Sequence, residues 1–157
     1  MLRKGGLRGA LGLSLLVLAM LLAACGAREG ADGAAQTGQR QYGKLIKIRG
    51  GSYRAITADE LAEMRQSLSL FLVNVHIPYE GEIEGTDAFI PFSEIEKHLD
   101  ELPADKSSPI VLYCRIGVMS ADAAKVMARL GYTGIYDLKG GMNAWKAAGR
   151  EILVKPG

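Results

Sequence analysis

Apolar and polar positions change period along the chain in a way that predicts alternating strands and helices. Four short apolar stretches, rich in β-branched residues, predict buried strands. They end near Ile56 or span 70–77, 109–114 and 134–138. The stretches that follow them show helical spacing and predict helices at 58–66, in a short segment after Ser93, at 120–130 and at 142–149. Because strands alternate with helices, we predict an α/β fold: a single domain whose mostly parallel sheet carries helices on both faces.

Several helix ends carry their own sequence signals. Thr57 is followed by Glu60, and Ser93 by Glu96, at the spacing of a capping box in the first turn of a helix. Gly131 follows the third predicted helix, at the position where a glycine commonly ends a helix. We therefore expect both Ser/Thr positions to begin α-helices.

The first part of the chain has a different pattern. Arg3, Lys4 and Arg8 precede the apolar stretch "ALGLSLLVLAMLLAA", an arrangement typical of an export signal. A membrane-spanning helix is the competing interpretation, but it needs about 20 apolar residues. The sequence "LAAC", which ends at Cys25, resembles a bacterial lipobox, in which cleavage leaves a lipid on that cysteine. A soluble signal with an incidental cysteine is the alternative.

These features predict the domain organisation. We expect a lipoprotein signal peptide at 1–24, a flexible tether with a lipidated Cys25 at 25–41, and the folded domain at 42–157. The protein is then exported to the cell envelope and anchored to a bacterial membrane through the lipid. The sequence does not distinguish the inner from the outer membrane.

Removal of the signal changes the charge and the cysteine content. Loss of three basic residues lowers the formal charge from +2 to −1, which removes the electrostatic basis for nucleic-acid binding. A lipid on Cys25 leaves Cys114 as the free thiol, so no internal disulfide forms. An unpaired thiol outside the cytoplasm is prone to oxidation and exchange, which marks Cys114 as a candidate reactive residue.

Cys114 stands where the third predicted strand meets the next helix. The residues "CRIGVM" must turn the chain sharply there, and Gly117 lowers the steric cost of that turn. Backbone N–H groups of such a loop, and of the helix start near Ser120, converge and favour an anion or a thiolate. Cys114 is therefore a candidate nucleophile. A small buried residue at the end of the strand is the alternative.

The second half of the chain resembles a known family. The stretch Val111–Gly149 is similar to the C-terminal half of a rhodanese-like domain, which has the loop pattern C-R-x-G-x-x-[ST] and the tail GG-x-x-AW-x-x-AG. The matching positions are Cys114, Arg115, Gly117 and Ser120 in the loop, and Gly140, Gly141, Ala144, Trp145, Ala148 and Gly149 in the tail. The upstream half fits more loosely, so the whole resemblance covers roughly residues 53–154.

The resemblance implies a sulfurtransferase that moves sulfane sulfur through a persulfide on Cys114. A donor such as thiosulfate supplies the sulfur in this family, and cyanide or a thiol accepts it. The N–H groups of the loop stabilise the anionic persulfide. The implied substrate-binding loop consists of Arg115, Ile116, Gly117, Val118, Met119 and Ser120. No metal and no organic cofactor is implied, and the oligomeric state is not predicted.

Departures from the family pattern bear on this expectation. Asn74 and His76 stand where the family usually has the aspartate and arginine of D-V-R, so the charges near the loop differ. His76 is a candidate auxiliary acid or base, because histidine exchanges protons near neutral pH. A structural histidine is the alternative. Glu82 and Glu84 replace other residues of the pattern and are expected in a solvated loop.

The loop itself is unusually apolar. Met119 replaces a polar or basic residue and, with Ile116 and Val118, leaves Arg115 as the single charge. We therefore expect a persulfide, polysulfide or protein-thiol substrate in place of dianionic thiosulfate. Related phosphatases need an arginine six positions after the cysteine, where this chain has Ser120.

A binding function is the alternative to catalysis. An exported rhodanese-like domain that binds a partner, or senses sulfur or oxidants, needs no turnover. The loss of the usual aspartate and arginine favours this alternative, whereas the retained Cys114 and Gly117 favour the enzyme. The two functions differ in whether Cys114 takes up sulfur.

Overall fold

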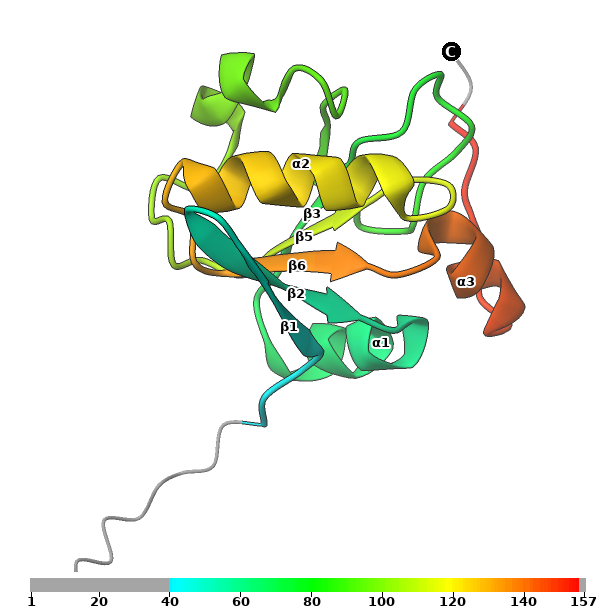
Figure 1. The fold of residues 1–157 in the computed structure, drawn as a ribbon. Helices are drawn as coiled ribbons and strands as arrows, with labels where there is room; N and C mark the ends of the chain where they lie inside the picture. The colour runs from blue at the N-terminus through cyan, green and yellow to red at the C-terminus, as the bar shows by residue number, and fades with distance from the viewer. Residues whose placement is uncertain (1–39, 156–157) are drawn as a thin grey trace, which may run out of the picture. The chain divides into compact units, whose positions relative to one another are not determined.

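The computed structural model describes residues 40–155 of the chain (Figure 1). Its six-stranded sheet has the order β1-β2-β6-β5-β3-β4. The strands are β1 (Lys44–Ile48), β2 (Gly51–Ile56), β3 (Phe71–Asn74), β4 (Ala88–Phe89), β5 (Ile110–Tyr113) and β6 (Ile135–Leu138). β1 pairs with β2 in the antiparallel sense, and the other neighbours in the sheet are parallel. The predicted α/β fold with a mostly parallel sheet is confirmed.

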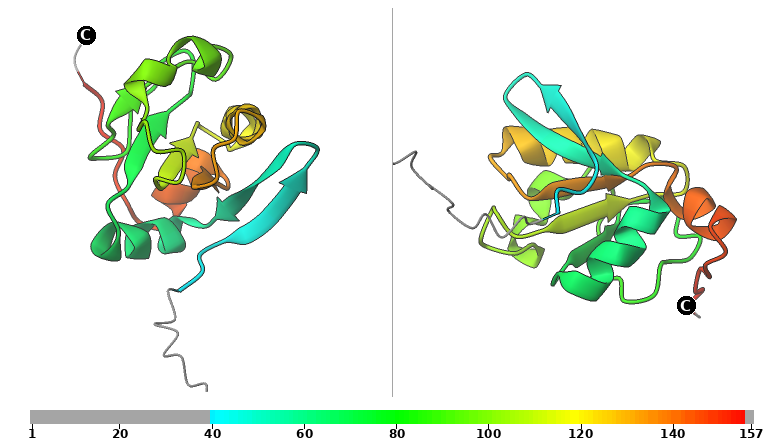
Figure 2. Two further views of the ribbon diagram at one scale, coloured as in Figure 1. Left: turned by 90° about the vertical axis from the view of Figure 1, so that its left-hand side faces the viewer. Right: turned by 90° about the horizontal axis from the view of Figure 1, so that it is seen from below.

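Helices cover both faces of the sheet (Figure 2). The helices are α1 (Ala58–Ser67), α2 (Val118–Arg129) and α3 (Gly141–Ala147), with two short 3-10 helices, η1 (Ile95–Lys97) and η2 (Leu99–Glu101). α2 and η1 bury Ala124, Met127 and Ile95 in one apolar cluster. α1 and α3 bury Leu61 and Trp145 in a second cluster, on the opposite face. The adjacent strands β5 and β3 send side chains into both clusters, which makes them the centre of the fold.

The capping box predicted at Thr57 is present at the start of α1. The backbone N–H of Glu60 donates to Thr57 Oγ1 at 3.2 Å, and the backbone N–H of Thr57 donates to Glu60 Oε2 at 2.8 Å. The other carboxylate oxygen of Glu60 accepts from the backbone N–H of Gly43 at 2.8 Å. One side chain therefore starts α1 and also holds the chain just before β1.

The capping box predicted at Ser93 and Glu96 is wrong, and so is the α-helix predicted after it. Ser93 makes no cap hydrogen bond, and the segment forms η1 and η2 in place of an α-helix. A turn closed by the Glu94 N–H and the Pro91 carbonyl precedes η1. A short segment without a side-chain cap lacks the local stabilisation that an isolated helical turn needs.

Two other boundaries differ from the sequence prediction. α2 begins at Val118 rather than at Ser120, which lies inside its first turn. β1 was not predicted, and it forms a hairpin with β2 at one edge of the sheet. No helix within residues 40–155 is long and apolar enough to cross a membrane. The predicted signal peptide, Cys25 and the tether up to residue 39 lie outside the described residues.

Candidate active site

Cys114 lies at the carboxyl edge of the sheet, where β5 ends. All residues of β5 are buried, and β5 pairs with β3 on one side and β6 on the other. The apolar run thus fixes the strand in the middle of the sheet and delivers Cys114 to the edge at which parallel sheets bind ligands. Cys114 itself is 1% exposed, and it is the free cysteine of the described part of the chain.

The sulfur atom of Cys114 receives a backbone hydrogen bond at the start of α2. The Gly117 N–H donates to Cys114 Sγ at 3.0 Å, and the Ser120 hydroxyl points at the same atom from 3.7 Å. Gly117 is the N-cap of α2 and has φ +90°, and a Cβ there would lie 2.8 Å from the backbone nitrogen of Gly140. The N-terminus of α2 therefore faces the sulfur and favours negative charge on it.

The tail motif supports the backbone of the Cys114 loop, defined here as residues 114–120. The Met142 N–H donates to the Cys114 carbonyl at 2.8 Å, and the Asn143 N–H donates to the Arg115 carbonyl at 3.0 Å. A Cβ on Gly141 would lie only 2.0 Å from the Cys114 carbonyl oxygen. The start of α3 thus satisfies loop carbonyls that would otherwise be left without donors. This contact physically joins the two sequence motifs, which lie far apart in the chain.

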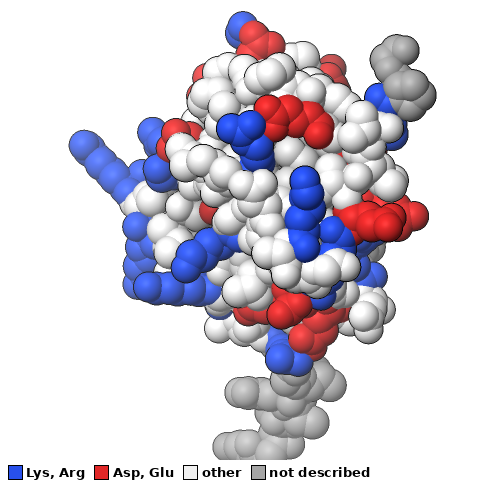
Figure 3. Space-filling model, turned by 90° about the vertical axis from the view of Figure 1, so that its right-hand side faces the viewer, with Lys and Arg blue, Asp and Glu red and all other residues white. Residues whose placement is uncertain are grey.

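The outer side chains of the Cys114 loop are mostly apolar. Ile116 is 53% exposed and Val118 is 60% exposed. Met119 is half-buried and packs against the α2 cluster, so it lies outside this exposed rim. Figure 3 faces the carboxyl edge of the sheet and shows charged side chains of both signs with uncharged surface between them. The rim therefore offers apolar contact next to a buried sulfur.

Arg115, the single charge of the loop, is held by an acid from another segment. Its Nη1 donates to Glu80 Oε1 at 2.9 Å and to Oε2 at 3.0 Å. Partial desolvation acts to raise the pKa of Glu80, but the hydrogen bond and charge of Arg115, helped by His76, hold that pKa below its usual value. Glu80 is a site residue that the sequence prediction missed, because it lies in the irregular segment after β3.

His76 faces Glu80 rather than Cys114. Its Nε2 lies 3.3 Å from Glu80 Oε2, a distance that suits an ion pair once the ring is protonated. The geometry is not that of a hydrogen bond, and within residues 40–155 neither ring nitrogen has a hydrogen-bond partner. His76 is 5% exposed and no hydrogen bond joins it to Cys114. Its position favours the structural alternative over an auxiliary acid or base.

The residue in place of the usual aspartate braces its own segment. Asn74 donates from Nδ2 to the Gly81 carbonyl at 2.9 Å and accepts the His76 N–H at 3.0 Å. The expectation that Glu82 is solvated is wrong: it is 5% exposed and pairs with Lys155 at 2.6 Å. Burial of this carboxylate is possible because Lys155 and the Tyr79 hydroxyl both contact it.

Asp137 is a second acid that the sequence prediction missed. It lies in β6, is 5% exposed, and its side chain interacts with the hydroxyl of Ser120. A signal was present, since Asp137 is a lone acid inside the apolar stretch "GIYDL". A buried acid in a strand next to the reactive strand is typical of functional sites.

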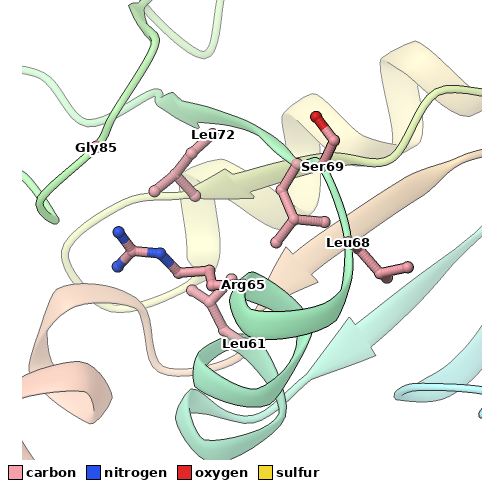
Figure 4. Close-up of a pocket in the computed structure, with 7 residues that line it drawn as sticks. Leu61, Arg65, Leu68, Ser69, Leu72 and Gly85 are labelled. Carbon is pink, nitrogen blue, oxygen red and sulfur yellow. The ribbon is translucent and has the colours of Figure 1, made fainter.

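The pocket drawn in Figure 4 is separate from this chemistry. It has a volume of about 260 Å³ and lies beside α1, where Arg65 reaches toward the segment around Gly85. The Arg65 guanidinium already donates to the Glu84 carbonyl at 2.8 Å. None of the lining residues belongs to the Cys114 loop. Among residues 40–155, no three His, Cys, Asp or Glu side chains are grouped so that they could hold a metal ion.

Comparison with known proteins identifies the family. The family model of the rhodanese-like domain matches residues 57–148. The uncharacterized protein YqhL of Bacillus subtilis is 39% identical over 77 residues, which make up 47% of this chain and 59% of YqhL. The chain thus spans less than two thirds of the length of that relative.

Other relatives are matched over nearly their whole length. The thiosulfate sulfurtransferase GlpE of Shewanella oneidensis is 29% identical over 100 residues, 62% of this chain and 96% of GlpE. A crystal structure of a rhodanese-related protein from Thermoplasma volcanium is similar with a TM-score of 0.57 and 28% identity, over 66% of this chain and 100% of that one. With the family model matching more than half of its length, this chain belongs to the rhodanese-like domain family.

Proposed function

We propose that this protein is a sulfurtransferase whose Cys114 carries sulfane sulfur as a persulfide. The observation that carries the proposal is the hydrogen bond from the Gly117 N–H to Cys114 Sγ, 3.0 Å long, at the N-terminus of α2. This arrangement stabilises a negative charge on sulfur, both before and after the sulfur is loaded. The relative GlpE, which bears the name thiosulfate sulfurtransferase, supports the same reaction class.

The reaction has two balanced steps. In the first, the Cys114 thiolate attacks the outer sulfur of the donor, a new S–S bond forms, and the donor leaves with the electrons of its broken bond to sulfur. In the second, a thiolate or cyanide acceptor attacks the outer sulfur of the persulfide, and Cys114 returns as the thiolate. Neither step needs an added oxidant or reductant.

The rim of the Cys114 loop favours a persulfide, polysulfide or protein thiol over thiosulfate. The guanidinium of Arg115 already binds the carboxylate of Glu80, so it offers little free positive charge to a dianion. Ile116 and Val118 instead present apolar surface beside the sulfur. We expect slow thiosulfate:cyanide turnover with a high KM, and rapid persulfide formation from a low-molecular-weight persulfide.

The test is the mass of the full chain after exposure to sulfane-sulfur donors, with Cys114→Ser as the control. The proposal predicts a gain of one sulfur atom in the parent protein and no gain in the variant. Efficient thiosulfate turnover with a low KM would contradict the proposed substrate class while leaving the sulfurtransferase intact. No adduct with any donor would contradict the enzyme and favour a binding or sensing module of this family.

We also propose that the protein works in the cell envelope, anchored through lipid on Cys25. The basic residues, the apolar stretch and the "LAAC" sequence support this location. Labelling of bacterial cells with a radioactive fatty acid tests it: the parent protein should incorporate label and Cys25→Ser should not. Equal labelling of both proteins, or of neither, would contradict the anchor.

A further inference from the structure

Asp137 is a buried acid in a place that a carboxylate occupies at a cost. It lies on β6, opposite Leu112 of β5 and Ala55 of β2. Its side chain is on the α2 face of the sheet, and the residue is 5% exposed. Within the described part of the chain, its Oδ1 has no hydrogen-bond partner. A buried charged oxygen without a donor is unfavourable, so the position favours the neutral carboxyl group.

Ser120 connects this acid to the reactive sulfur. It is fully buried, and its hydroxyl points at Cys114 Sγ from 3.7 Å. The same hydroxyl also acts on the Asp137 carboxyl group and favours its ionised form, although their contact is not a hydrogen bond of normal length. A hydroxyl has one proton to donate and can rotate, so Ser120 serves either the sulfur or the carboxylate at one time.

The other groups around Asp137 do not neutralise it. Burial raises the pKa of Asp137 to about 6, and the Ser120 hydroxyl and the positive charge of Lys125 on α2 oppose this rise only in part. Tyr53 of β2 faces the acid too, and burial and the Asp137 charge raise the pKa of its hydroxyl. Lys125 is itself shared with Asp122 at 2.9 Å. Asp137 therefore takes up a proton in weakly acidic solution.

We propose that Asp137 and Cys114 share one proton through the hydroxyl of Ser120, so that the charge on Asp137 sets how much thiolate Cys114 supplies. As the thiol S–H bond breaks, Ser120 Oγ accepts that proton and passes its own proton to the Asp137 carboxylate. The products are a thiolate, an intact hydroxyl and a neutral carboxyl group. The Gly117 N–H and the Ser120 hydroxyl then donate to the thiolate. Asp137 is a positioning residue, because it acts through Ser120.

This coupling gives a particular dependence on pH. In acid, Asp137 is neutral and the thiolate fraction rises with pH in the usual way. Once Asp137 loses its proton, its negative charge opposes a second charge on sulfur, so the thiolate fraction levels off before it rises again. An asparagine at this position cannot ionise, and the thiolate then forms in a single step at lower pH.

The test is the rate at which iodoacetamide alkylates Cys114 in the full chain, from about pH 5 to about pH 9. The parent protein should show two steps with a shoulder between them. Asp137→Asn should show one step and react roughly three- to tenfold faster near neutral pH. Asp100→Asn is the matched control: it removes one exposed carboxylate from η2 and should keep both steps. A single step in both the parent protein and Asp137→Asn would overturn the proposal.

A second measurement covers the case in which Asp137→Asn does not fold. The Asp137 carboxyl is titrated by NMR in the parent protein and in Cys114→Ser, whose side chain does not ionise. Sharing predicts two coupled steps in the parent protein and one in the variant, while identical curves would overturn it. The catalytic use of the shared proton rests on the proposed function, but neither readout needs a sulfur donor. Failure of persulfide formation with a two-step alkylation curve would therefore count against the sulfurtransferase alone.

Discussion

Gly141 shows at the residue scale how closely the tail motif approaches the reactive loop. A Cβ on this residue would lie 2.0 Å from the Cys114 carbonyl oxygen and 2.8 Å from the Arg115 carbonyl carbon. Gly141→Ala should therefore lower the free energy of unfolding by about 3 kcal/mol, because backbone atoms on both sides must move. Urea denaturation measures this change.

The matched control for this substitution is Gly131→Ala. Gly131 also has a positive φ, +88°, but no atom lies within 4 Å of the added methyl group. Its substitution should cost about 1 kcal/mol, from backbone strain alone. Equal costs at the two glycines would show that the close approach of Gly141 to the loop does not matter for stability.

The raised pKa of Asp137 makes the stability of the protein depend on pH. The pKa is raised from 3.8 to about 6 by burial, so the folded protein binds more protons than the unfolded chain between these values. Stability due to this group is fully present below the lower value and is lost as pH rises through the window. The total loss is about 3 kcal/mol.

Asp137→Asn should remove that loss. We expect the variant to resemble the parent protein near pH 4 and to be more stable by about 3 kcal/mol above pH 7, as measured by urea denaturation at both values. Acids and histidines elsewhere change both proteins alike and cancel in the difference. A difference that does not vary with pH would contradict the shifted pKa.

At the scale of elements, the two Ser/Thr positions with capping-box spacing provide a controlled comparison. Thr57→Ala removes the side chain that accepts the Glu60 N–H, and it should cost about 1 kcal/mol of the free energy of unfolding. Ser93→Ala removes a side chain that caps nothing, and its effect should stay within about 0.5 kcal/mol. Urea denaturation of both variants checks the difference, and similar costs would contradict it.

The elements differ in how well local sequence predicted them. β5 and β6 were predicted well because their apolar runs suit only a buried strand, and α1 because its cap is local. The α-helix after Ser93 was wrong because helical spacing by itself does not supply a cap. The start of α2 was misplaced because its N-cap is Gly117, whose close contact is with Gly140, from a distant part of the chain.

At the scale of the whole molecule, the pairing of Arg115 with Glu80 joins the Cys114 loop to the segment after β3. Glu80→Gln should free the guanidinium of Arg115 for an anionic donor and lower the KM for thiosulfate roughly fivefold at low salt. Steady-state kinetics measure this change, and added salt should reduce it because the charges are exposed.

Glu84→Gln is the matched control for that substitution. It makes the same charge change in the same connecting segment, but the side chain of Glu84 has no contact with Arg115 in the described structure. Its KM for thiosulfate should stay near that of the parent protein. An equal fall in KM in both variants would point to net charge rather than to release of Arg115.

The sequence by itself determined the α/β class, the central strands and the place of Cys114 after a buried strand, because periodicity and caps act between near neighbours in the chain. It also indicated the family through the loop and tail motifs, but not why they occur together. Only the tertiary structure placed α3 beneath the loop carbonyls, Glu80 on Arg115, and Asp137 beside Ser120. These contacts join residues that are distant in sequence, and burial among them, rather than residue type, determines which side chain holds a proton.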